Sequence, residues 1–488
     1  MKVFLVGMMG SGKSTIGKLL SNILGYRFID MDEEIEKSEG KRIRDIFKQR
    51  GEEYFRKLEK KLLKEISQRR EDLIVATGGG VIKDQENREI LKEHKTIFLM
   101  VEPEELLKRT EGNDRPLLEG GKDKIFDIWR QREKFYKQFT TAESTGLNVW
   151  ETCVKVLYKV MERESLSIMD SVHKVLIERK ALEDIKGDVV FTTCSVQKIY
   201  GEFLGNPYIF PDGESVKDMK YVLEAYKILC DIGFSRSQVV TGVGGGALTD
   251  FTGFVASTFK RGTKLFLYPT TLLAQVDASI GGKNAVNFEG VKNLLGTFKM
   301  PDLVVIDPLA SLSMNDERFK EGIIEAFKMS LISGKGLNYF NDELLMRKLR
   351  DVEKIIEFSV KEKLRIVEKD PHDRGIRNVL NFGHTIGHVY ESITKVSHGV
   401  AVGWGMIKET EFFMKRKMSD RIVLKLLEDF LAKLDIGSLP SLDRQRVYRF
   451  LRNDKKFQSG RVRIPVIRAP GNYDFVEVEI EELMEVIW

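Results

Sequence analysis

The chain of 488 residues has few of the features that mark secreted or membrane-bound proteins. Its three cysteines (Cys153, Cys194 and Cys230) are odd in number and widely spaced, which excludes a disulfide scaffold and is expected of a reduced cytoplasmic protein. No apolar run approaches the ~18 residues that a membrane span requires. The first residues lead directly into a strand and a glycine loop, so no signal or transit peptide is predicted.

An excess of one charge is also lacking, because 79 basic side chains oppose 74 acidic ones and the net charge is only +5. Such a charge is weak support for nucleic-acid binding, and local basic patches for phosphorylated small molecules explain it equally well. The length allows two or three domains of roughly 100–200 residues each. We therefore expect a multidomain protein whose partners are small-molecule substrates, with no nucleic acid and no membrane.

Strand-like and helix-like segments alternate in the first third of the chain. Apolar strands are predicted at 2–6, 73–77 and 96–101, with helical stretches between them and a closing helix at 150–163. This alternation predicts an α/β fold, a parallel sheet with helices on both faces. The polar stretch 162–171 is the best candidate for a linker.

A second α/β region follows, and its predicted strands lie at 174–177, 188–193, 238–242 and 264–268. From Asp307 onward the pattern is mainly helical, and only 462–467 and 474–480 resemble strands. The expected domains are a P-loop domain, an α/β domain and a mainly helical domain, at 1–162, 171–306 and 307–488.

A glycine loop stands between the first strand and the first helix, with the sequence Gly7-Met8-Met9-Gly10-Ser11-Gly12-Lys13-Ser14-Thr15. The spacing is that of a P-loop, in which backbone N–H groups surround phosphates, a lysine reaches the β and γ oxygens, and a hydroxyl ligates Mg²⁺. This pattern predicts ATP with Mg²⁺ and leaves the phosphate acceptor open. The expected nucleotide-binding residues are Gly10, Ser11, Gly12, Lys13, Ser14 (also the Mg²⁺ ligand) and Thr15.

Four later motifs narrow the choice of acceptor. They are Asp30-Met31-Asp32, Gly51-Glu52-x-x-Phe55-Arg56-x-x-Glu59, Thr77-Gly78-Gly79-Gly80 and Asp114-Arg115-Pro116-Leu117-Leu118. With the P-loop, they make residues 1–160 resemble shikimate kinase, and they argue against gluconate and adenylate kinases. The resemblance implies that Asp32 orients or deprotonates the acceptor hydroxyl.

The same resemblance implies roles for the flanking residues. The shikimate carboxylate would pair with guanidinium groups, which match a planar carboxylate in two-pronged hydrogen bonding. The implied contacts are Arg56 and Arg132 with that carboxylate, Gly79 with the ring, Arg109 with adenine, Arg115 on a lid at 110–122 with the γ-phosphoryl group, and Asp30 with Mg²⁺ through water.

A cluster late in the chain is typical of a metal site. Asn381-Phe382-Gly383-His384-Thr385-Ile386-Gly387-His388 is followed by His398-Gly399, and imidazoles are common zinc ligands. His384 and His388, at i and i+4, share a helix face, so spacing alone would make both of them ligands. A packed histidine pair without metal fits that spacing equally well.

Dense further blocks make residues 171–488 resemble 3-dehydroquinate synthase. The blocks are Pro211-Asp212-Gly213-Glu214-x-x-Lys217, 244–250, 261–283, 290–296, Gly322-Ile323-Ile324-Glu325-Ala326-Phe327-Lys328 and Arg377-x-x-x-Asn381. The resemblance assigns Zn²⁺ (or Co²⁺) to Glu325, His384 and His398, with His398 in a loop, and makes His388 a substrate-side group. This choice departs from the plain i, i+4 spacing.

The resemblance also implies an NAD site and a cage for a phosphorylated sugar acid. The NAD site comprises Asp212, Glu214, Lys217, Gly245, Gly246, Ala247, Asp250, Thr270, Thr271, Lys283, Lys292 and Asn293. The cage comprises Arg261, Asp277, Lys283, Asn293, Lys328, Lys363, Arg377, Asn381, His388, Lys455 and Lys456. The expected catalytic residues are Lys13, Asp32 and Arg115 in the kinase half, and Lys283, Lys328, Lys363, Arg377, Asn381 and His388 in the synthase half.

Two segments depart from the synthase pattern. Thr192-Thr193-Cys194-Ser195 stands where an Asp-x-Asn usually reaches the adenosine ribose, and Asp373 replaces a usual glutamate. Inosose- or valiolone-type cyclases and glycerol-type alcohol dehydrogenases are alternatives for this half, and one half could be a decayed regulatory or dimerisation module. We expect a bifunctional shikimate-pathway enzyme, a homodimer through its synthase half, that phosphorylates shikimate and converts 3-deoxy-D-arabino-heptulosonate 7-phosphate to 3-dehydroquinate.

Overall fold

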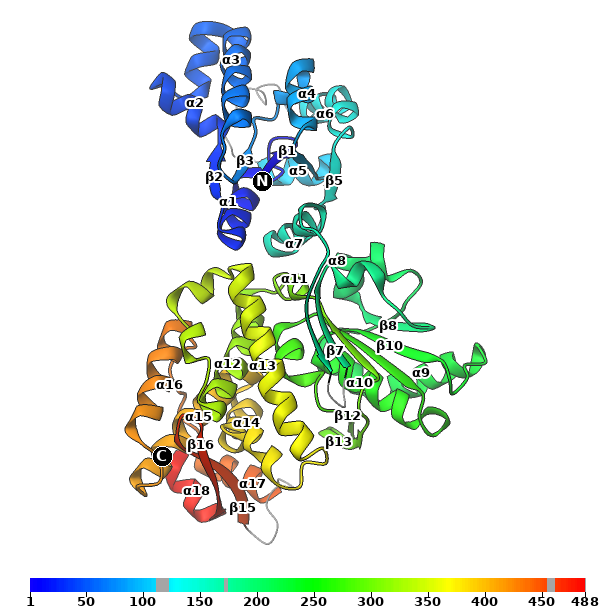
Figure 1. Cartoon of the computed structure of the whole chain (residues 1–488), viewed down its shortest axis with the longest axis vertical. Helices are drawn as coiled ribbons and strands as arrows, with labels where there is room; N and C mark the ends of the chain where they lie inside the picture. The colour runs from blue at the N-terminus through cyan, green and yellow to red at the C-terminus, as the bar shows by residue number, and fades with distance from the viewer. Residues whose placement is uncertain (111–122, 171–173, 454–460, 488) are drawn as a thin grey trace. The chain divides into compact units, whose positions relative to one another are not determined.

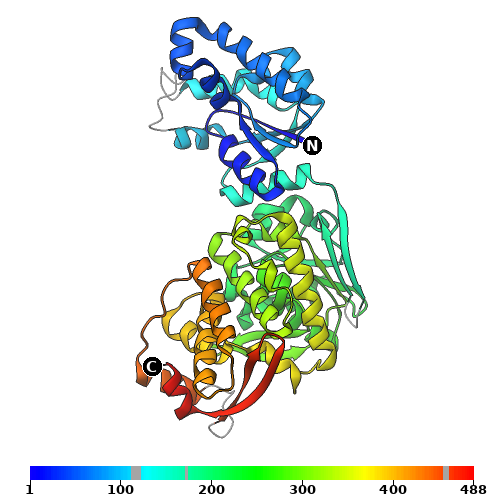
Figure 2. The same cartoon turned by 60° about the vertical axis from the view of Figure 1, so that its left-hand side comes forward.

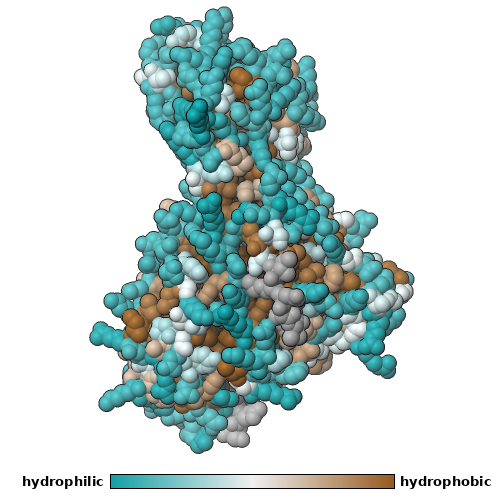
Figure 3. Space-filling model, viewed as in Figure 1, coloured by the Kyte–Doolittle hydropathy of each residue, from teal (hydrophilic) through white to brown (hydrophobic). Residues whose placement is uncertain are grey.

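A computed structural model describes residues 1–110, 123–170, 174–453 and 461–487. The chain divides into two compact units, one comprising Met1–Glu162 with Met346–Leu349 and the other Arg163–Leu345 with Arg350–Trp488. Within the described residues, no helix combines the length and apolar character that a membrane span needs. The face drawn in Figure 3 is mostly hydrophilic, with scattered hydrophobic patches.

The first unit contains a five-stranded parallel sheet in the order β2-β3-β1-β4-β5. Helices cover both faces of the sheet, and α1 packs on β3 and α7 while α4 contacts β4 (Figure 1). The predicted strands and the closing helix are confirmed to within a few residues. The elements are β1(Lys2–Val6), α1(Lys13–Leu24), β2(Arg27–Asp30), α2(Met31–Glu39), α3(Ile43–Gln68), β3(Leu73–Ala76), η1(Val81–Lys83), α4(Gln85–Lys92), β4(Lys95–Met100), α5(Pro103–Thr110), α6(Asp123–Tyr136), β5(Thr140–Glu143) and α7(Val149–Val160).

The order of this sheet places the glycine loop. β1 lies between β3 and β4, and the chain leaves its carboxyl end through Gly7–Gly12 into α1. The strand order changes direction at β1, because later strands of the chain flank it on both sides. In α/β sheets, ligands bind at the carboxyl ends of the strands at such a point. Phe4 and Val6 are fully buried in a core with Leu73, Val75 and Phe98.

The second unit begins with a seven-stranded sheet in the order β6-β7-β14-β11-β10-β8-β9, parallel except for β6. A separate hairpin, β12–β13, contacts α10 through β12. The elements are β6(Glu164–Asp170), β7(Lys174–Arg179), η3(Ala181–Asp184), β8(Val189–Thr193), α8(Cys194–Leu204), β9(Tyr208–Phe210), η4(Gly213–Lys217), α9(Met219–Asp231), β10(Val239–Gly244), α10(Gly246–Thr258), η5(Phe259–Arg261), β11(Lys264–Pro269), η6(Ala274–Ala278), β12(Lys283–Phe288), β13(Val291–Phe298) and β14(Leu303–Ile306).

The expected linker is wrong. Residues 164–170 form β6, which pairs antiparallel with β7 along the edge of the sheet, Glu164 opposite Arg179 and Asp170 opposite Lys174. The polar composition suggested a linker, but an edge strand meets solvent along one side and tolerates polar residues there. Leu166 and Ile168 alternate with Ser165 and Ser167 in the sequence, a short stretch of the two-residue period of a strand.

The rest of the second unit is mainly helical, as predicted. A single hairpin, β15–β16, occupies the two predicted strand segments and lies beside α18 near the C-terminus (Figure 2). The elements are α11(Pro308–Ser311), α12(Asp316–Ser333), η7(Leu337–Tyr339), η8(Asp342–Met346), α13(Leu349–Lys369), η9(Ile376–Asn381), α14(His384–Thr394), α15(His398–Lys415), α16(Arg421–Leu434), α17(Arg444–Asn453), β15(Arg461–Ala469), β16(Asn472–Glu479) and α18(Ile480–Ile487).

Candidate active sites

The glycine loop of the first unit has the geometry of a phosphate site. Gly12 caps α1 with φ 88°, a left-handed conformation that glycine adopts without strain. Lys13 Nζ donates to the carbonyl oxygens of Gly7 and Met8, at 3.0 and 2.9 Å. The ammonium group therefore lies folded over the loop, where it can exchange these carbonyls for phosphate oxygens.

Asp30 and Asp32 follow β2 at the same edge of the sheet. Asp30 accepts a 2.5 Å hydrogen bond from Ser14 Oγ and also caps α2 through the backbone N–H groups of Asp32 and Glu33. Asp30 thus caps α2 and also contacts Ser14, the expected Mg²⁺ ligand. Asp32 lies in the first turn of α2, partly buried.

The residues expected to hold the acceptor gather around the backbone of Gly79. Arg132 donates to the Gly79 carbonyl at 2.9 Å, and the Tyr136 hydroxyl donates to the same oxygen at 2.6 Å. Arg56 pairs with Glu59 at 2.6 Å and with Glu52 at 3.1 Å. The contribution of Tyr136 could not be inferred from a motif, because it depends on where α6 packs.

Glu59 is a buried carboxyl within this group. It is 0% exposed, and its Oε1 has no hydrogen-bond partner in the part of the chain that the structure describes. Burial raises the pKa of Glu59, although Arg56 opposes that effect. An anionic acceptor would have to compete with Glu59 and Glu52 for the Arg56 guanidinium.

Of the two remaining residues expected to contact the nucleotide, the structure describes Arg109 and not Arg115. Arg109, in the last turn of α5, forms an ion pair with Glu105. Arg115 and most of the lid expected at 110–122 lie outside the described residues.

In the second unit, three helices bring the expected metal ligands together. Glu325 lies on α12, His384 is the first residue of α14, and His398 is the first residue of α15 rather than part of a loop. The Nε2 atoms of both histidines lie 3.6 Å from Glu325 Oε1. Candidate ligand atoms of these three residues all lie within 4.8 Å of one another.

This group suits a divalent cation. The Glu325 side chain is 1% exposed, and Lys328 Nζ lies 2.5 Å from its Oε2. Among the described residues, neither carboxylate oxygen accepts a well-aligned hydrogen bond. Burial alone would raise the pKa of Glu325, but Lys328 and His398 outweigh burial and lower it to about 2. A buried charged carboxylate facing two imidazoles is a donor set that zinc prefers.

A second possible group shares one member with the first. His388, Glu391 and His398 also lie close enough to hold an ion. His398 Nδ1, however, lies 3.0 Å from Glu391 Oε2, and Lys292 Nζ donates to Glu391 Oε1 at 2.9 Å. A carboxylate on Nδ1 orients the ring and leaves Nε2 for a metal on the Glu325 side.

The protonation of His398 reflects these two carboxylates. Burial would lower the pKa of His398, but Glu325 and Glu391 together raise it to about 10. A cation that binds Nε2 must therefore displace a proton. Glu391 was not among the expected site residues, although its spacing of three from His388 and seven from His384 places all three on one face of α14.

The helices that carry the three histidines touch backbone to backbone at Gly405. A Cβ at this position would lie 2.6 Å from Gly387 N and overlap the Gly383 carbonyl oxygen. Gly405→Ala should push α14 and α15 apart and destabilise the second unit by about 1–3 kcal/mol. Calorimetry should show an earlier unfolding transition.

Gly403→Ala is the matched control, because the nearest atom to its Cβ would be the mobile end of Leu431, at 3.1 Å. Equal melting temperatures for the two variants would contradict this account of the helix contact.

The expected NAD residues lie at the carboxyl ends of neighbouring strands. Gly245 caps α10 directly after β10, and Thr270 N–H donates to Gly244 O at 2.9 Å directly after β11. Lys217 Nζ contacts Asp250 Oδ2 at 2.8 Å and also reaches Asn293 of the β12–β13 hairpin. The N-terminus of α10 thus lies beside the loops that follow β10 and β11, the usual place for a dinucleotide pyrophosphate in α/β folds.

The unusual segment at 192–195 has a local partner. Ser195 donates from both N and Oγ to Asp212, at 3.1 and 2.6 Å for Oδ1. Asp212 therefore brings a carboxylate to the end of β8, where the chain lacks the usual acidic residue. Glu214 accepts from Asn287 Nδ2 at 3.0 Å, which joins η4 to the hairpin.

Several residues of the expected substrate cage are already held by ion pairs and hydrogen bonds within the protein. Lys363 pairs with Asp277 at 2.7 Å, and burial lowers the pKa of Lys363. Lys283 pairs with Asp373, the residue that replaces a glutamate. Asn381 Nδ2 lies 3.4 Å from Asn378 Oδ1, and Lys328 donates to Leu380 O at 2.7 Å.

Arg377 is the member of this cage with unused donor capacity. Its side chain is almost fully buried, and burial lowers its pKa. NH1 donates to Pro371 O at 2.9 Å, whereas the buried Nε has no partner among the described residues. A buried guanidinium N–H without an acceptor is unfavourable. An anionic oxygen of the substrate would supply the missing acceptor.

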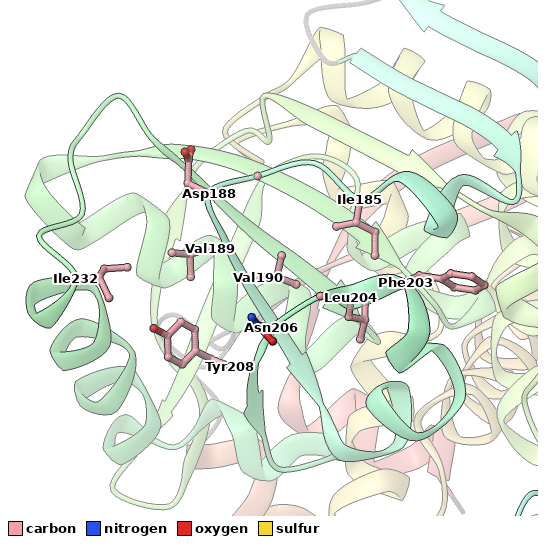
Figure 4. Close-up of a pocket in the computed structure, with 11 residues that line it drawn as sticks. Ile185, Asp188, Val189, Val190, Phe203, Leu204, Asn206, Tyr208 and Ile232 are labelled. Carbon is pink, nitrogen blue, oxygen red and sulfur yellow. The ribbon is translucent and has the colours of Figure 1, made fainter.

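Arg261 is not brought to the cage, and two further expected residues cannot be placed. Arg261 is exposed before the amino end of β11, a strand length of roughly 20 Å from Thr270. Lys455 and Lys456 lie outside the described residues. The hollow in Figure 4, lined by Asp188, Asn206 and Tyr208 among others, lies at the amino end of β8 and contains none of the expected site residues.

Known proteins match both units. The shikimate kinase family model matches residues 9–161, and the N- and C-terminal models of 3-dehydroquinate synthase match residues 207–321 and 322–457. A bifunctional shikimate kinase/3-dehydroquinate synthase from Thermotoga maritima is 49% identical over 100% of both chains. A 3-dehydroquinate synthase from Sulfolobus acidocaldarius is 33% identical over 72% of this chain and 97% of its own.

A solved structure shares the fold of the second unit. A 2-epi-5-epi-valiolone synthase from Streptomyces hygroscopicus, with NAD⁺ and Zn²⁺ bound, matches 66% of this chain and 98% of its own, with a TM-score of 0.60 and 23% identity. At this identity the likeness concerns the fold alone. The full-length match and the three family models agree in order and extent: this chain belongs to the family of bifunctional enzymes that join a shikimate kinase to a 3-dehydroquinate synthase.

Proposed function

We propose that each activity of this bifunctional enzyme uses the residues gathered in one unit: shikimate is phosphorylated at the P-loop, and 3-dehydroquinate forms at the Glu325–His384–His398 group. The observation that carries the second assignment is the buried Glu325 carboxylate, which faces two imidazole nitrogens at 3.6 Å each. The two sets share no residue, so the activities should be separable.

In the kinase, ATP is held by the P-loop and Mg²⁺ by Ser14, with Asp30 behind it. Asp32 accepts the proton of the acceptor hydroxyl as its oxygen attacks the γ-phosphorus. Lys13 leaves the carbonyls of Gly7 and Met8 and follows the developing charge on the phosphoryl oxygens. Arg56 and Arg132 hold the shikimate carboxylate, and the Gly79 carbonyl, fixed by Arg132 and Tyr136, shapes the floor of the site.

In the synthase, a bound divalent cation would polarise a hydroxyl pair of the substrate and NAD would exchange a hydride with it. Glu325, His384 and His398 hold the cation. The residues from Asp212 to Asn293 named above hold NAD, with Lys217 joining the α10 and hairpin sides. Arg377 supplies its unpaired Nε to an anionic oxygen, and His388 faces the substrate one turn from His384.

The protein's main contribution to this reaction is positioning and charge control. Asp277 and Lys363 are held as a pair, and the two lysines Lys363 and Lys328 outweigh burial and lower the pKa of Asp277. The cage can thus accept a phosphate dianion by rearranging existing pairs. A homodimer formed through the synthase half and a cytoplasmic location also belong to this proposal.

Metal removal tests the division between the units. Dialysis against dipicolinate should abolish dehydroquinate formation, and added Zn²⁺ or Co²⁺ should restore it. Shikimate phosphorylation, assayed with fresh Mg²⁺ and ATP, should stay at the native rate because Ser14 binds a different ion. Full dehydroquinate formation in demonstrably metal-free protein would refute the metal assignment, and sedimentation of the same samples would test the dimer.

A further inference from the structure

Glu409 is a buried carboxylate on α15 that contacts the first turn of α14. It is 1% exposed. Its Oε2 accepts from Gly383 N at 2.7 Å, and its Oε1 accepts from Thr385 N at 3.1 Å and Ile386 N at 3.2 Å. Three backbone N–H groups at the start of one helix are therefore satisfied by a side chain of another.

Helix α14 cannot provide this cap itself. Its N-cap residue is Gly383, which has no side chain, and the first N–H groups of a helix have no partner within it. Glu409 takes the place of the usual Ser, Thr, Asp or Asn. The cap also ties α14 to α15, so it joins the helix that begins with His384 to the helix that begins with His398.

A cation at this location would be repelled by the positive ends of nearby helices, and a carboxylate offsets that repulsion. A helix N-terminus carries about half a positive charge, and His384 and His398 are the first residues of their helices. A cation held by these side chains would sit beside two positive helix ends. At α15 the N-cap residue, Ser397, makes no side-chain cap hydrogen bond. Glu409 is the cap that places a negative charge at one of the two ends.

We propose that Glu409 is a positioning residue for the metal centre, which it serves by fixing the first turn of α14 and offsetting the positive end of that helix. It acts through His384 and touches neither the cation nor the substrate. The inference rests on the proposed metal ligands. It predicts that the charge of Glu409 matters, and not only its shape.

Glu409→Gln removes the charge and one of the two acceptor oxygens while keeping the length of the side chain, whereas Glu409→Asp keeps the charge and both oxygens. Metal-free native and variant proteins are titrated with Co²⁺ against a chromophoric chelator. The variant should bind Co²⁺ about 10–100-fold more weakly, the size of effect typical of groups behind metal ligands. The visible absorption band of bound Co²⁺ should also shift, since His384 is held less firmly.

Glu411→Gln is the matched control on the same helix, because Glu411 is partly exposed and pairs with Lys408 at 3.0 Å. It should bind Co²⁺ as the native protein does. The thermal unfolding transition of the second unit reports whether each variant is folded, because shikimate phosphorylation reports on the first unit. Equal Co²⁺ affinity and an unchanged spectrum in Glu409→Gln would overturn the proposal.

Two further variants keep the outcomes distinct. If Glu409→Gln loses the fold of the second unit, Glu409→Asp decides, because it retains the charge on a shorter side chain. Near-native Co²⁺ affinity in Glu409→Asp supports the proposal, and loss of fold or of affinity there overturns the role of charge. His384→Ala tests the ligands themselves: if it binds Co²⁺ as the native protein does, the metal assignment fails, independently of Glu409.

Discussion

Lys13→Ala is expected to lower shikimate phosphorylation at least about a hundredfold, the effect typical of removing one preorganised charge-stabilising group. Dehydroquinate formation by the same sample should remain at the native rate. The reason is local, because Lys13 donates to the carbonyl oxygens of Gly7 and Met8 in the glycine loop of the first unit. Asp32→Asn should give the same pattern through loss of the proton acceptor.

Both activities are measured on one preparation, with ADP release for the kinase and phosphate release for the synthase. Lys18→Ala is the matched control: Lys18 lies on the same helix, α1, is 59% exposed and forms only a loose pair with Glu33 at 3.6 Å. It should change neither rate by more than about twofold, as expected for an exposed ion pair. Loss of both activities in a folded Lys13→Ala protein would refute independent sites.

The second large effect concerns the metal ligands. Glu325→Ala, His384→Ala and His398→Ala should each reduce bound zinc from about one equivalent to near zero, because three protein ligands are the minimum of a catalytic zinc site. Dehydroquinate formation should be lost with the metal. His388→Ala should keep the zinc and still impair the reaction.

Metal analysis of the purified variants distinguishes the two possible groups. Both contain His398, so the informative pair is His384→Ala against His388→Ala. Zinc retained in the first and lost in the second would show that His388, Glu391 and His398 form the site. Circular dichroism and the unfolding transition of each variant show whether the second unit is folded, because kinase activity reports on the first unit.

Sequence could predict those parts of the fold and the sites that depend on neighbours along the chain. The P-loop, the alternating elements and the helix face shared by His384 and His388 follow from local spacing. The strand β13 was not predicted, because all of its side chains, including Phe298, are exposed or half-buried. Without a buried face, a strand has no two-residue hydrophobic period to detect.

Local sequence patterns could not predict contacts between segments that are distant along the chain. Lys292 and Glu391 are 99 residues apart, and Glu409 caps a helix that begins 25 residues earlier. Ser195 donates to Asp212, which lies 17 positions away along the chain. Such partners depend on how helices and loops pack, and no motif in either segment indicates the other.

The strand β6 has a practical consequence for dividing this enzyme. Helix α7 ends at Val160 and β6 begins at Glu164, so only three residues separate the last helix of the kinase from the sheet of the synthase. A synthase half produced from residue 171 would lose β6 and leave the backbone of β7 unpaired along a sheet edge, which invites association with other chains. We propose that the synthase half starts at Arg163. Almost no linker then separates the two halves, so there is little sequence in which a protease could cleave or a truncated protein could begin.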